Sequence, residues 1–127
     1  MRRAFPFWPL DGVTALINVV GPANARDILL SARLFDTEEA IAMGLVNKVV
    51  EGAQLEDAVR DYATKMATNA PLTMLAAKTA IREALKDPEH RDGKTVSALV
   101  ARCFDSEDYR EGVKAFLEKR RPSFQGK

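Results

Sequence analysis

The stretch SEDYREGVKAFLEKRRPSF, residues 106–124, constrains the fold most, because it has the pattern of an amphipathic helix. Its large apolar residues recur at helical spacing and fall on one face: Tyr109, Val113, Phe116 and Leu117. Asp105 or Ser106 can cap the start of this helix, and Pro122 can stop it. We therefore expect the chain to close with a helix that packs one side and exposes the other.

The end of this predicted helix combines apolar and cationic side chains. Lys119, Arg120 and Arg121 lie where the negative end of the helix dipole favours cations, within a turn of the apolar face. This combination suits an anionic ligand with a flat, stackable part. The same charges are also typical of an ordinary solvated helix end, and the pattern alone favours this second interpretation.

Length and charge indicate one soluble domain, or part of one. With 127 residues, of which 46% are hydrophobic, the chain is long enough to bury a core. The 19 basic and 18 acidic residues are intermixed, so neither nucleic acid nor an anionic membrane is expected as a partner. No apolar run approaches the ~18 residues of a membrane span. No signal peptide follows Met1, so we expect a cytoplasmic protein.

Residue types with their own chemistry are scarce. The single cysteine, Cys103, falls on an apolar helical face and is expected to be a small core residue, and the single histidine, His90, lies in a polar loop. The acidic pairs at 38–39 and 107–108 stand at predicted helix starts, where capping and the dipole explain them. No glycine-rich phosphate loop or nucleophile–histidine–acid set is recognisable. We therefore assign no catalytic residue and no metal ligand.

The periodicity of the chain predicts a mainly α protein with two short strands. Residues 1–10 contain two prolines and three aromatic residues and are expected to be irregular. Short strands are predicted at 34–35 and 45–50, and Gly44 is expected to adopt a left-handed conformation between a helix and the second strand. The predicted helices are 11–20, 23–31, 38–43, 54–68, 71–85 and 96–104, followed by the closing helix.

Three stretches, in this order, resemble the crotonase, or enoyl-CoA hydratase/isomerase, superfamily. The first, at 21–50, contains the matching residues Ser31-Ala32-Arg33, Glu39-Ala40 and Gly44-Leu45-Val46. The second, NAPLTMLAAKTAIREAL at 69–85, is similar to a later helix pair of that family. The third, at 106–124, is similar to its C-terminal pattern S-x-D-x-x-E-G-x-x-A-F-x-E-K-R-x-P-x-F. The resemblance covers roughly residues 10–127.

The resemblance implies a fold and an incomplete catalytic apparatus. Residues 1–127 would form a single truncated domain, the C-terminal helical part of the crotonase ββα spiral fold. After the irregular 1–10, residues 11–50 would end the spiral core, and 51–127 would serve oligomerisation and CoA contact. Crotonase chains are about twice this length. Their oxyanion loop and first catalytic acid lie in the other half, and the second acid would fall at about Met1 or just upstream.

The resemblance also implies a ligand site and an activity. Phe116 would pack near the CoA adenine and acyl pocket, and Lys119 would meet a CoA phosphate, both in a neighbouring subunit of a trimer or a pair of trimers. The substrate would be an acyl-CoA or enoyl-CoA, with no separate cofactor. The expected function is hydration of 2-enoyl-CoA thioesters in fatty-acid metabolism, with this chain inactive alone. The alternatives are a non-catalytic helical oligomerisation module that assembles with full-length relatives, and an unrelated helical bundle.

Overall fold

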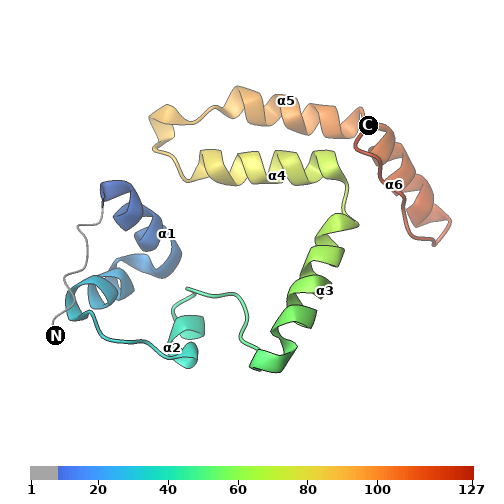
Figure 1. Ribbon diagram of the computed structural model, residues 1–127. Helices are drawn as coiled ribbons and strands as arrows, with labels where there is room; N and C mark the ends of the chain where they lie inside the picture. The colour runs from blue at the N-terminus through green and yellow to red at the C-terminus, as the bar shows by residue number, and fades with distance from the viewer. Residues whose placement is uncertain (1–8) are drawn as a thin grey trace. The chain divides into compact units, whose positions relative to one another are not determined.

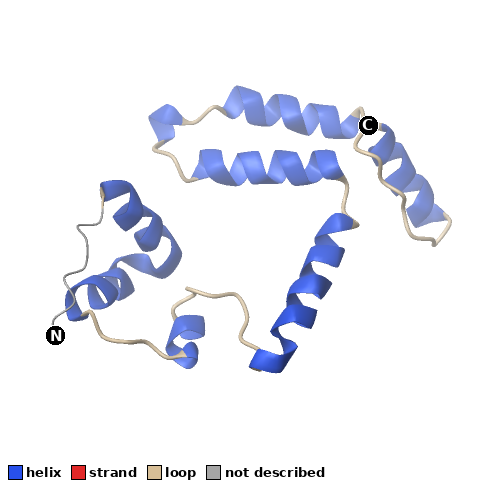
Figure 2. Ribbon diagram, viewed as in Figure 1, coloured by secondary structure: helices blue, strands red, loops and turns tan. Residues whose placement is uncertain are grey.

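The computed structural model describes residues 9–127, and these residues form helices joined by loops (Figures 1 and 2). The predicted irregular segment 1–10 therefore lies outside the described residues except for its last two positions. The α-helices are α1 (Leu10–Arg26), α2 (Thr37–Ala42), α3 (Leu55–Ala67), α4 (Pro71–Ala84), α5 (Gly93–Phe104) and α6 (Glu107–Leu117). Three short helical turns join them: η1 (Asp27–Ser31), η2 (Gly52–Gln54) and η3 (Pro88–His90). The chain divides into two compact units, one ending at Gly52 and one beginning at Ala53.

In the first unit, α1 is interrupted where the sequence predicts a break between two helices. Gly21 has φ 77° and ψ 165°, so the helical path stops there and restarts at Pro22. Proline suits a first helical position because its missing N–H is not needed there. Val20 and Ala25, on either side of the break, are the buried apolar residues of α1.

Arg33 connects η1 with α2 inside this unit. Its guanidinium pairs with Asp27 at 2.9 Å and with Glu39 at 2.7 Å, and it lies 3.8 Å from the centroid of the Phe35 ring. Asp36 and Glu39 form a capping box, because each side chain accepts a hydrogen bond from the other's backbone N–H. The helix predicted at 38–43 therefore forms, one residue earlier than predicted and capped by Asp36.

The two predicted strands are not formed in the described part of the chain. Segments 34–35 and 45–50 are extended or irregular loop with no ladder partner (Figure 2). A β-branched run favours extended backbone, but a strand exists only when its N–H and C=O groups pair with another strand. The predicted left-handed Gly44 is confirmed, with φ 77°.

In the second unit, α4 and α5 lie side by side and antiparallel (Figure 1). The buried residues of α4 recur at helical spacing on one face: Leu72, Ala76, Thr79 and Glu83. Ile81 and Leu85, on the opposite side of the helix, are exposed. One face of α4 is therefore covered within the unit, and a second apolar stripe is not.

Glu83 holds the connection between α4 and α5. Its carboxylate accepts hydrogen bonds from the Lys86 ammonium at 2.7 and 2.8 Å and from the Asp92 backbone N–H at 2.9 Å. The Lys86 ammonium, aided by the Asp92 N–H, lowers the pKa of Glu83. Asp92 in turn caps α5 by accepting from the Thr95 N–H at 2.9 Å. This cap explains why α5 begins at Gly93, three residues before the predicted start.

Candidate functional site

The closing helix, α6, forms where the sequence predicts it and begins at a capped residue. Ser106 accepts a hydrogen bond from the Tyr109 N–H at 3.0 Å, and acidic residues fill the first turn. Ala115 is almost fully buried, whereas the larger apolar residues of α6 remain exposed: Tyr109, Val113, Phe116 and Leu117. The helix therefore keeps most of its apolar face accessible in this structure.

The end of α6 differs from the prediction. The helix ends at Leu117, and Lys119 has a positive φ of 53°. The Lys119 N–H donates to the Phe116 carbonyl at 3.2 Å, and the Arg120 N–H donates to the Ala115 carbonyl at 3.0 Å. This is the Schellman end of a helix, in which a left-handed residue turns the chain away from the axis. Lys119 is thus the first residue after the cap, not part of the last helical turn.

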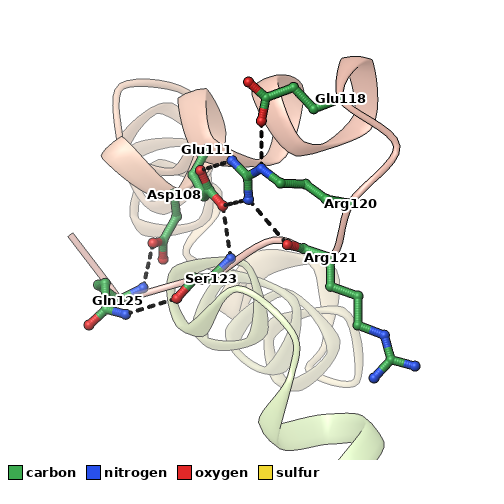
Figure 3. A network of polar contacts seen from close by, with 7 residues as sticks. All are labelled: Asp108, Glu111, Glu118, Arg120, Arg121, Ser123 and Gln125. Atoms are coloured by element: carbon green, nitrogen blue, oxygen red, sulfur yellow. Dashed lines mark hydrogen bonds and ion pairs between the residues drawn. The ribbon is translucent and has the colours of Figure 1, made fainter.

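After this turn, the last residues of the chain return along α6 (Figure 3). The buried carboxylate of Asp108 accepts from the backbone N–H of Gln125 at 2.6 Å and of Gly126 at 2.8 Å. The Asp108 N–H donates to the Lys127 carbonyl at 3.2 Å. An acid that the sequence assigned to the helix dipole therefore also anchors the C-terminal tail.

A second acid of α6, Glu111, binds the tail one turn further on. The Arg120 guanidinium donates to both Glu111 carboxylate oxygens, at 2.6 and 2.8 Å, and its Nε donates to Glu118 at 2.6 Å (Figure 3). The Ser123 N–H also donates to Glu111, at 2.9 Å. The Arg120 guanidinium, aided by the Ser123 N–H, lowers the pKa of Glu111 to about 2. The same pairing raises the pKa of Arg120.

An apolar groove runs between α4, α5, α6 and the tail, with a volume of about 630 Å³. Phe116 is one of its lining residues and is 83% exposed. Cys103 also lines the groove, so it lies on an apolar face as predicted, but it is only half-buried and is not the core residue that the sequence predicts. The other groove residues include Leu72, Ala76, Val100, Phe104, Tyr109 and Phe124.

The structure brings the two predicted ligand-contacting residues together at one end of α6. Phe116 and Lys119 are joined by the backbone hydrogen bond described above, and the ring is largely exposed. His90 lies apart from them, in the loop between α4 and α5. Sequence reasoning missed Asp108, Glu111 and Arg120 as tail anchors. Two acids three residues apart, followed by a proline that cannot continue the helix, were the available signal.

The described residues 9–127 contain no group of three or more His, Cys, Asp or Glu side chains arranged to hold a metal ion. Among the same residues, no helix has the length and apolar character that crossing a membrane requires. The carboxylates at the site instead accept hydrogen bonds from backbone and guanidinium groups.

Comparison with known proteins places the chain in a family. The family model described as enoyl-CoA hydratase/isomerase matches residues 7–127. Among similar sequences, (E)-benzylidenesuccinyl-CoA hydratase of Thauera aromatica is 41% identical over 118 residues, covering 92% of this chain and 46% of that protein. Short-chain-enoyl-CoA hydratase of Clostridium acetobutylicum is 32% identical over 110 residues, covering 87% of this chain and 42% of that protein.

Solved structures agree with the sequence comparison. The crystal structure of an enoyl-CoA hydratase/carnithine racemase from Magnetospirillum magneticum superposes with a TM-score of 0.84 at 34% identity, covering 96% of this chain and 45% of the other. The chain therefore belongs to the enoyl-CoA hydratase/isomerase, or crotonase, family, and its fold is a helical C-terminal part of the crotonase fold. It spans somewhat less than half the length of the relatives it matches.

Proposed function

We propose that this chain is the CoA-contacting C-terminal part of an enoyl-CoA hydratase-like protein, which adds water across the double bond of 2-enoyl-CoA thioesters in acyl-CoA metabolism. Family membership supports the reaction class, and the end of α6 supports the ligand contact. The observation that carries the contact is the pairing of an 83% exposed Phe116 ring with Lys119, three residues on.

The chemistry of these two side chains matches the two ends of the CoA nucleotide. An aromatic ring offers a face for a purine, and an ammonium binds a phosphate as a point charge. No ion pair of Lys119 occurs within residues 9–127, whereas its neighbour Arg120 is paired with Glu111 and Glu118. Lys119 therefore has its charge available for a ligand.

The contact is tested by titrating the chain with CoA in a calorimeter. We expect Lys119→Gln to weaken binding about tenfold, the loss of one charge-assisted contact. Phe116→Leu should weaken it as well, because a leucine offers no flat face to a purine. Lys114→Gln is the matched control, since it removes the same charge from an exposed position of the same helix. Equal affinities for the three variants and the original chain would contradict the contact.

We propose further that residues 1–127 alone do not catalyse hydration. Hydration needs an acid or base free to handle water and N–H groups aimed at the thioester oxygen. Asp108 and Glu111 at the site already accept hydrogen bonds from the tail and from Arg120. With crotonyl-CoA, we expect no loss of enoyl absorbance above the background. Turnover that persists through repeated purification would refute this proposal.

A second candidate is a non-catalytic oligomerisation module, and exposed apolar surface on α3 favours it. Leu55, Val59, Tyr62 and Met66 recur on one face of α3 and are all about half exposed or more. Native mass spectrometry of the chain mixed with a full-length relative would separate the candidates. Mixed trimers formed by a chain that binds no CoA on its own would favour the module, and CoA binding by the chain alone would favour the first candidate.

A further inference from the structure

The backbone of Lys119 is left-handed, a conformation that is sterically unfavourable for a residue with a side chain. With a φ of 53°, it lies in the left-handed region, where glycine is the usual residue at this position of a helix end. The neighbouring structure must therefore hold it there. The two backbone hydrogen bonds of the helix end contribute, but both are local to residues 115–120.

Besides the hydrogen bonds of the helix end, a second restraint on the Lys119 backbone comes from the next residue, Arg120. Its guanidinium forms two hydrogen bonds with Glu111, one with Glu118 and one with the Arg121 carbonyl at 3.1 Å (Figure 3). A planar guanidinium held by these hydrogen bonds has little rotational freedom left. The two adjacent cations therefore differ in role, because Arg120 directs its donors to its own chain.

The chain on the far side of Arg120 is held as well. Glu111 accepts from the Ser123 N–H, and Asp108 accepts from the N–H groups of Gln125 and Gly126. Lys119 thus lies between the end of α6 and a tail that is hydrogen-bonded to α6. These contacts restrain the backbone of Lys119 and therefore set the direction of its Cα–Cβ bond.

We propose that Arg120 is a positioning residue, which holds Lys119 left-handed through the Glu111–Arg120 pair and so directs the Lys119 ammonium toward a CoA phosphate. The proposal rests on the CoA contact proposed above. Arg120 itself does not contact the ligand. Its effect on CoA binding passes through Lys119.

Arg120→Lys tests this role at constant charge, since lysine cannot form the fork to Glu111. Arg121→Lys is the matched control, because the Arg121 side chain points away from the network (Figure 3). A left-handed Lys119 gives a strong intraresidue HN–Hα nuclear Overhauser effect in NMR spectra of the unliganded chain. This signal should weaken in Arg120→Lys and persist in Arg121→Lys. CoA affinity should fall about tenfold in the first variant alone, as for one charge-assisted contact.

A double-mutant cycle separates positioning from a general structural role. In a Lys119→Gln background, Arg120→Lys should cause no further loss of CoA affinity. An equal loss in both backgrounds would overturn the proposal, and so would an unchanged NMR signature of Lys119 in Arg120→Lys. If the original chain binds no CoA, the proposed CoA contact fails, and the NMR comparison alone decides whether Arg120 sets the conformation of Lys119.

Discussion

Lys119 and Gly44 occupy the same position at the ends of two helices. Each follows a helix cap, has a positive φ, and precedes a residue whose N–H closes a six-residue hydrogen-bonded turn. Glycine adopts this conformation without steric cost, and lysine does not. We attribute the exception to the proposed CoA contact, which needs an ammonium at the end of α6.

This comparison predicts opposite stability effects at the two positions. Lys119→Gly should raise the free energy of unfolding by about 0.5–1 kcal/mol while it weakens CoA binding. Gly44→Ala should lower it by about 1 kcal/mol. The nearest atom to an added Cβ at Gly44 is the Val19 carbonyl oxygen at 3.7 Å, so that cost is conformational and not a clash. Urea unfolding measures both, and a destabilised Lys119→Gly variant would contradict the assignment.

Glu111 makes stability depend on pH in the acidic range. Its pKa is about 2 in the folded chain, against a usual 4.5, so the unfolded chain binds more protons between these values. The contribution of Glu111 to stability is therefore complete above pH 4.5 and is lost as the pH falls toward 2. In Glu111→Gln, the slope of unfolding free energy against pH should be shallower over this window. An unchanged slope in Glu111→Gln would contradict this assignment.

At the scale of elements, the sequence predicts most helix bounds to within a residue, and the exceptions are the start of α5 and the end of α6. Asp36 and Ser106 are short polar residues before apolar repeats, and each caps a helix as expected. The end of α6 was placed too late, because Lys119, Arg120 and Arg121 fit the negative end of a dipole. The helix ends at Leu117 in a Schellman turn at Lys119, and the tail beyond that turn binds Asp108 and Glu111 through contacts 12 to 18 residues apart in the sequence.

The cap of α6 predicts a local stability effect. Ser106→Ala should lower the free energy of unfolding by about 1 kcal/mol, because the Tyr109 N–H loses its acceptor. Ser123→Ala is the matched control, since Ser123 binds Glu111 through its backbone N–H and alanine keeps that group. Thermal or urea unfolding of the two variants checks the difference, and equal stabilities would show that the cap contributes little.

At the scale of the whole molecule, much apolar surface is left uncovered. Few apolar side chains are buried in the described residues, whereas the apolar stripes on α3 and α6 are about half exposed or more. A surface of this kind usually marks an interaction site or favours aggregation. The trimers that the family resemblance implies would cover such stripes, and the second proposed function depends on them.

Association through α3 gives a prediction that charge-matched variants can test. Val59, 59% exposed on the apolar stripe, should tolerate Val59→Lys without loss of helix content. Association should nevertheless weaken, because a lysine ammonium would have to be buried without a partner. Asp57→Asn changes the net charge equally on another face of α3 and should leave the association unchanged. Sedimentation velocity over a concentration series measures it, and parallel behaviour of the two variants would exclude α3 as the contact surface.

Local chemistry in the sequence determined the mainly α character, the capped helix starts, the break at Gly21 and the left-handed Gly44. Each of these depends on residues within a few positions of one another, so spacing and residue type suffice. The placement of Phe116 and Lys119 at one helix end follows for the same reason.

Only the tertiary structure decided the remaining features, because they depend on partners distant in the sequence. The segments at 34–35 and 45–50 have strand-forming residues but no ladder partner in the described chain, so they are not strands. Asp108 and Glu111 anchor a tail that lies 12 to 18 residues further on. Arg120 pairs with Glu111 nine residues back, so only the structure shows that the two neighbouring cations differ in their contacts.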